Sequence, residues 1–181
     1  MKITPRRLAG TCEIKLEARG DERGSFMRWY DREAFAAAGL PTDWAQGNES
    51  ASRRNVVRGL HFQRRPHAET KLVRAVTGAV FDVFVDLRAE SPTYGEWDAL
   101  ELSAARKNAV LIPKGFAHGF CAISEEAVVS YLVDNAYAPA FEGGLAWDDP
   151  RLAIPWPLSG PAIISAKDRA WPRLAQLEPL A

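Results

Sequence analysis

The chain has 181 residues, a length that suits a single domain able to bury most of its apolar surface. Its 23 lysines and arginines equal its 23 aspartates and glutamates, so no bulk positive field indicates nucleic-acid binding, and no apolar run reaches the ~20 residues of a membrane span. Cys12 and Cys121 lie far apart, without metal-ligand spacing. We therefore expect a cytoplasmic protein with two free thiols and with no nucleic-acid or membrane partner.

The first recognisable element is a short helix between Asp31 and Ala38. Asp31 is a good N-cap, and the residues that follow favour a helix. Gly39 and Pro41 then end it.

The middle of the chain predicts one strand after another. Residues 79–87 alternate in the period of two typical of a half-buried strand, with Asp82 and Asp86 on the face opposite the apolar side chains. Thr77–Gly78 predicts a turn before this strand. Further short strands are expected at 72–76, 110–113, 118–123 and 128–133. Many short strands with one early helix predict an all-β sandwich, jelly roll or small barrel.

Residues 147–181 are rich in proline and tryptophan, and we expect them to wrap over the barrel. Within them, Ser165-Ala166-Lys167-Asp168 resembles a capping box that opens a short last helix. The whole chain, 1–181, is expected to be one domain with an N-terminal arm over about 1–20.

Two of the three histidines, His61 and His118, stand at the centres of the segments RGLHFQ and GFAHGF. The sequence has no His-x-His pair, and His67 lies in a polar loop flanked by proline, so a metal site is disfavoured. Seven cations crowd into 22 positions, as either a solvated surface or a pocket for phosphate: Arg53, Arg54, Arg58, Arg64, Arg65, Lys71 and Arg74.

Acid/base chemistry suits these residues better than metal binding. His61 is a candidate general base, and Lys71 is a candidate cation for the oxygen of an enolate. Tyr131 or Tyr137 is a candidate acid for the opposite face of the substrate. Each has an ordinary alternative, because a histidine or tyrosine in a strand is commonly a core residue. By the same reasoning Asp168 is a helix-capping acid and Glu142 a loop carboxylate.

Seven segments, in order, resemble the dTDP-4-dehydrorhamnose 3,5-epimerase family. They are 21–24 (DERG), 58–63 (RGLHFQ), 71–74 (KLVR), 86–88 (DLR), 91–95 (SPTYG), 112–120 (IPKGFAHGF) and 165–168 (SAKD). The resemblance implies a cupin-type jelly roll, a homodimer with exchanged N-terminal strands, and no metal or organic cofactor. It also implies inversion of C3 and C5, which flank the ketone of a nucleotide-linked 4-keto-6-deoxyglucose.

The resemblance also assigns roles to single residues. His61 matches the base, Asp168 its carboxylate partner, Lys71 the lysine near the C4 oxygen, and Tyr131 the acid. Tyr137 matches a tyrosine that stacks on the thymine ring. The other positions that match substrate contacts are Arg23, Arg58, Gln46, Asn48, His118, Glu142 and Lys167.

Three segments depart from the family pattern. Arg28 stands at a substrate-contacting position where an acidic residue is usual, Gly47-Glu49 replaces Asp-Asn-His, and His67-Thr70 replaces a glutamine-rich stretch. They leave other readings open: a single-position (3- or 5-) epimerase acting on a different nucleotide-linked 4-keto sugar, or a 3,4-ketoisomerase. A catalytically silent nucleotide-sugar-binding barrel and a metal-dependent cupin are weaker alternatives.

Overall fold

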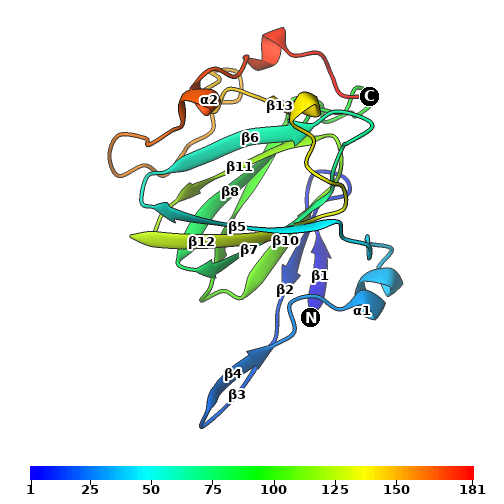
Figure 1. Cartoon of the computed structure of the whole chain (residues 1–181), viewed down its shortest axis with the longest axis vertical. Helices are drawn as coiled ribbons and strands as arrows, with labels where there is room; N and C mark the ends of the chain where they lie inside the picture. Colours follow the sequence, from blue (N-terminus) through cyan, green and yellow to red (C-terminus); the bar gives the residue numbers. More distant parts are fainter.

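Two antiparallel sheets face each other in the computed structural model, which describes all 181 residues (Figure 1). The six-stranded sheet has the order β1 (Lys2–Pro5), β2 (Cys12–Lys15), β10 (Asn108–Ile112), β7 (Lys71–Thr77), β12 (Glu126–Val133) and β5 (Gln46–Arg53). The five-stranded sheet has the order β13 (Glu142–Gly144), β6 (Val57–Gln63), β11 (Phe116–Ala122), β8 (Ala79–Asp86) and β9 (Trp97–Ser103). The expected cupin-type jelly roll is confirmed.

Three apolar layers hold this barrel together. The first lies between the two sheets and includes Phe84, Ile112 and Val129. The second lies on the outer face of the five-stranded sheet, where the segment after β13 covers it with Leu152 and other apolar side chains. The third lies on the outer face of the six-stranded sheet, under the segment that contains α1. Both sheets are therefore buried on both faces over much of their area.

Burial on two faces corrects the expectation that β8 is half-buried. Asp82 and Asp86 were expected on a solvent face, yet both are fully buried (0% exposed). The alternation itself is right, since Val83 and Val85 pack under the C-terminal segment while Phe84 faces the barrel interior. Asp82 therefore points into the barrel, where a carboxylate needs a partner.

The expected helices are present. α1 (Arg32–Ala37) has Asp31 as its N-cap, with the Asp31 side chain accepting from the Ala34 N–H at 3.1 Å. α2 (Ala166–Arg169) has Ser165 as its N-cap. Two short 3₁₀ helices cover Pro139–Phe141 and Leu174–Gln176. Neither α-helix is long enough to cross a membrane.

One element stands apart from the barrel. β1 and β2 are part of the six-stranded sheet, whereas β3 (Ala18–Asp21) and β4 (Gly24–Met27) form a hairpin of their own. Figure 1 shows this hairpin projecting from the body at the end far from α2. Phe26 on the hairpin is 68% exposed, although it is a large apolar side chain.

Candidate active site

His61 on β6 and Asp168 on α2, far apart in sequence, form a hydrogen-bonded pair. Nε2 of His61 lies 2.7 Å from Oδ1 of Asp168. Burial would raise the pKa of Asp168, but the hydrogen bond and charge of His61 hold it below its usual value. An ionised carboxylate only accepts, so Nε2 carries the proton and Nδ1 keeps its lone pair. The pair thus presents a base oriented by a carboxylate.

Local backbone features place this pair. The Ser165 hydroxyl accepts from the Asp168 N–H at 3.0 Å, so Ser165 caps α2 without help from the Asp168 side chain. The capping box predicted from sequence is therefore only half formed, and the carboxylate turns to His61 instead. Its second oxygen accepts from the Gly59 N–H at 3.3 Å. Gly59 has φ +124°, and a Cβ there would lie 2.6 Å from the Cα of Gly119, so only glycine lets β6 approach β11 this closely.

Trp171 packs beside the His61 ring of this pair. Its ring lies edge-on to His61, with centroids 6.3 Å apart, and Lys167 Nζ lies 5.7 Å from its centroid. The ring packs on Gly144, where a Cβ would lie 2.3 Å from a ring carbon. Trp171 therefore limits the movement of the imidazole.

The His61–Asp168 pair opens into a cavity of about 560 Å³. Its other polar and ionisable side chains include Arg58, Lys71, His118, Tyr131 and Lys167, and its apolar side includes Val56, Phe120 and Ile163. A site of this size, with a few polar groups converging on an apolar wall, is typical of a small-molecule pocket.

The acid/base candidates come from opposite walls of this pocket. His61 and His118 are cross-strand partners in the five-stranded sheet. Tyr131 pairs with Val73 in the six-stranded sheet, and Lys71 lies two residues from Val73 on the same face. Tyr131 and Lys71 therefore face the histidines across the interior. A substrate held between the sheets would have a base on one side and a phenol on the other.

Tyr131 is partly buried, and His118 is buried. Burial raises the pKa of Tyr131, and the nearby charge of Glu69 raises it further, so the phenol stays protonated at neutral pH. His118 Nε2 lies 2.9 Å from Oδ2 of Asp82. Asp82 was not predicted as a site residue. In the sequence, the only signal for Asp82 is that a carboxylate stands in the middle of a largely apolar strand, β8.

A second polar cluster lies at the rim of the pocket. The Tyr137 hydroxyl and the Lys167 ammonium both donate to Oε2 of Glu142, at 2.6 and 2.5 Å. The hydrogen bond to Glu142 raises the pKa of Tyr137, and the same carboxylate raises that of Lys167. Burial would raise the pKa of Glu142, but its bonds to Lys167 and Tyr137 lower it. The Gln46 side chain accepts from the Tyr137 N–H at 2.5 Å, and 54% of Tyr137 is exposed.

The remaining predicted contacts divide into two groups. Arg58 lines the pocket and donates to the Ser52 hydroxyl at 3.0 Å, while Asn48 pairs with Tyr131 from β5. Arg23 and Arg28 do not line the pocket: Arg23 pairs with Asp21 within the projecting hairpin, and Arg28 lies 3.0 Å from Asp31.

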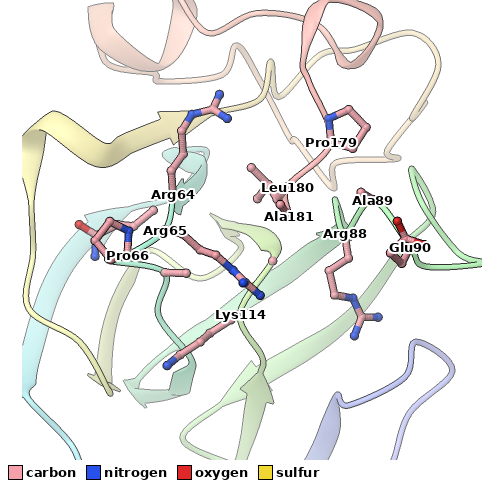
Figure 2. A pocket seen from close by; sticks show the side chains of 13 residues that line it. Arg64, Arg65, Pro66, Arg88, Ala89, Glu90, Lys114, Pro179, Leu180 and Ala181 are labelled. Atoms are coloured by element: carbon pink, nitrogen blue, oxygen red, sulfur yellow. The ribbon is translucent and has the colours of Figure 1, made fainter.

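The largest cavity, about 860 Å³, is a different one (Figure 2). Its cations are Arg64, Arg65, Arg88 and Lys114, and the last residues of the chain close one side. Arg88 is bound to Asp86 and Lys114 to Asp134. None of the acid/base candidates lines it, so it is not where the predicted chemistry would take place.

No group of three or more His, Cys, Asp or Glu side chains in the structure is arranged to hold a metal ion.

Comparison with known proteins decides the family. The family model described as dTDP-4-dehydrorhamnose 3,5-epimerase matches residues 5–176. The chain belongs to this family. A Salmonella typhimurium member of that name is 48% identical over 158 residues, covering 87% of this chain and 86% of the relative. A Streptomyces niveus relative named dTDP-4-dehydrorhamnose 3-epimerase is 47% identical over 170 residues, covering 93% and 82%.

A solved family structure also agrees with the fold. The Legionella pneumophila dTDP-6-deoxy-D-glucose-3,5-epimerase, in complex with dTDP-4-keto-L-rhamnose, has a TM-score of 0.94 and 37% identity. The match covers 98% of this chain and 94% of the other. The expected membership of the epimerase family, first based on seven short segments, is confirmed over almost the whole chain.

Proposed function

We propose that this epimerase-family protein is a dTDP-4-dehydrorhamnose 3,5-epimerase. It would invert C3 and C5 of dTDP-4-keto-6-deoxyglucose without a cofactor, in the synthesis of dTDP-rhamnose or a related deoxysugar. The observation that carries the proposal is the His61–Asp168 pair, 2.7 Å apart, in a pocket that also holds Lys71 and Tyr131. Family membership supplies the substrate class.

His61 is the proposed base. Nδ1 takes a proton from the carbon next to the C4 ketone, and the C–H electron pair moves to form an enolate with its charge on the C4 oxygen. The imidazolium that results is stabilised by the ionised carboxylate of Asp168. No other hydrogen bond occupies His61, so Nδ1 is free to do this.

Lys71 is the proposed partner of the enolate oxygen. A proton next to a ketone is only weakly acidic, so the developing charge needs a cation. Losing one such stabilising donor costs about 10²–10³ in rate. Lys71 lines the pocket with only 10% of its side chain exposed, where its charge is weakly screened.

Tyr131 is the proposed acid. Inversion requires a proton to return on the face opposite the one it left. Tyr131 and His61 stand on opposite sheets, which supports this division of roles. The raised pKa of the phenol keeps the acid protonated.

The nucleotide end of the substrate is proposed to lie at the rim cluster. Tyr137 offers an exposed ring for stacking on a base, and polar contacts come from Arg58, His118, Lys167, Glu142, Gln46 and Asn48.

Arg23 and Arg28 would contribute only from a second copy, since neither lines the pocket of its own chain. We therefore propose a homodimer in which the β3–β4 hairpin, with its exposed Phe26, reaches the partner. Two buried free thiols, Cys12 and Cys121, support a cytoplasmic location.

Inversion at one carbon only is the second candidate, because a 47%-identical relative is named a 3-epimerase. The test is to incubate the purified protein with dTDP-4-keto-6-deoxyglucose, reduce the ketone chemically, and determine the sugar configuration at C3 and C5. The proposal expects inversion at both carbons. Inversion at C3 alone or at C5 alone would replace it with the second candidate, and no change at either carbon would refute both.

A further inference from the structure

A buried carboxylate beside Lys71 belongs to none of the roles described above. Glu69 lies in the segment that leads into β7, and its Oε1 is 3.3 Å from Nζ of Lys71. The exposed fraction of the two side chains is 11% and 10%. Removing two charges from water costs free energy, and their attraction offsets this cost only when the pair keeps a close geometry. The ion pair therefore restricts the positions of both side chains.

The other carboxylate oxygen fixes Glu69 in place. Oε2 accepts from the Gln63 amide at 3.0 Å, and Gln63 is 4% exposed. The same amide donates to the Ala136 carbonyl at 3.2 Å and accepts from the Ala138 N–H at 2.6 Å. These two backbone groups flank Tyr137. One carboxylate thus joins Lys71 on β7 to the loop that carries Tyr137.

Glu69 also acts on Tyr131, which lies on β12, the strand next to β7. Its negative charge adds to burial in raising the pKa of the Tyr131 phenol, whereas Arg58 opposes this and Glu142 adds to it. The other ionisable side chains facing the interior are His61 on β6, His118 on β11 with its partner Asp82 on β8, and Lys167 and Asp168 on α2. Glu69 is the carboxylate that forms the ion pair with the Lys71 ammonium.

We propose that Glu69 is a positioning residue for the epimerisation, holding the Lys71 ammonium at the enolate oxygen and tying it to the loop under the nucleotide. This inference rests on the proposed function, because it takes Lys71 as the partner of that oxygen. It assigns a role to the segment His67–Thr70, where the chain departs from the usual family pattern.

The test is the pH profile of kcat for Glu69→Gln. Glutamine has nearly the same shape, and its carbonyl can still accept from Gln63, but its NH2 group cannot accept from Lys71, so the charge and the contact with the ammonium are lost together. The expected result is a fall in kcat of about tenfold with KM changed by less than about twofold. The alkaline limb should also move to lower pH, because activity needs protonated Tyr131 and loss of the Glu69 charge lowers the pKa of that phenol.

Two further variants make the result decisive. Glu69→Asp keeps the charge, so its alkaline limb should stay near that of the wild type even if kcat falls. Glu90→Gln, which removes an exposed carboxylate outside the pocket, should change neither. The inference is overturned if Glu69→Gln retains the wild-type kcat and limb, or if Glu69→Asp shifts the limb as far as glutamine does. Inactive wild-type protein would refute the proposed function instead.

Discussion

Replacing Asp168 by asparagine removes the charge that orients His61, together with the acceptor for the Gly59 N–H at 3.3 Å. The side chain is 6% exposed and its Oδ1 lies 2.7 Å from Nε2 of His61. Asparagine keeps the shape and the capped start of α2, where Ser165 supplies the hydrogen bond. The carboxylate charge that stabilises the imidazolium is lost. The neutral imidazole should therefore remain bound in nearly the same place, but it should be a poorer base.

The size of the effect follows from the pair's geometry. Opposite unit charges about 4 Å apart attract by about 4 kcal/mol at a partly buried site, which corresponds to roughly 10³ in rate. The His61 side chain is 31% exposed, so solvent screens part of this attraction. We therefore expect kcat to fall by about 10²–10³ in Asp168→Asn, with KM and the dissociation constant for dTDP nearly unchanged.

The assay is exchange of the C3 and C5 protons with D₂O, followed by proton NMR, together with calorimetric titration of dTDP. Asp148→Asn is the matched control, because Asp148 is exposed and forms no ion pair. Exchange within about threefold of the wild type, in a variant that still binds dTDP, would refute the account of the pair, since it predicts a loss of about 10²–10³.

Three more predictions concern other parts of the molecule. Tyr131→Phe should still exchange substrate protons but lose most net inversion, which NMR of the product measures; unchanged inversion would exclude Tyr131 as the acid. Gly144→Ala should displace Trp171 and destabilise the fold by about 1–3 kcal/mol, seen in urea unfolding, and an unchanged midpoint would contradict the close packing. Burial would raise the pKa of Asp86, but hydrogen bonds from Arg88 and neighbouring hydroxyls lower it to about 2. The ionised carboxylate should therefore add roughly 2 kcal/mol to the free energy of unfolding above about pH 4, and this contribution should disappear as the pH falls toward 2. Asp86→Asn should lack this acid-dependent part, and an unaltered pH dependence of unfolding would contradict the assignment.

Local patterns predicted the all-β class because their signals are short-range. The alternation in β8, the turn at Gly78 and the Asp31 cap of α1 all depend on neighbouring residues, and the structure confirms them. The prediction that Asp82 faces solvent was wrong. Its burial depends on the second sheet, which covers one face of β8, while the C-terminal segment covers the other face. The alternation of residues along β8 carries no information about either.

The active site shows the same division between local and distant information. From its neighbours alone, Asp168 is a helix-capping acid, and only the family resemblance paired it with His61. The structure explains why both descriptions were plausible, because Ser165 does the capping and leaves the carboxylate free for His61. Glu69 was not predicted, since nothing in its local sequence indicates that Lys71 and Gln63 share its two oxygens.

The central claim is that His61 removes the protons on both carbons next to the ketone. Its most direct test is proton NMR of dTDP-4-keto-6-deoxyglucose in D₂O with the wild type and with His61→Ala. The account predicts deuterium at both C3 and C5 with the wild type, and none with His61→Ala although that variant still binds dTDP. Deuterium incorporation at the wild-type rate by His61→Ala would contradict it.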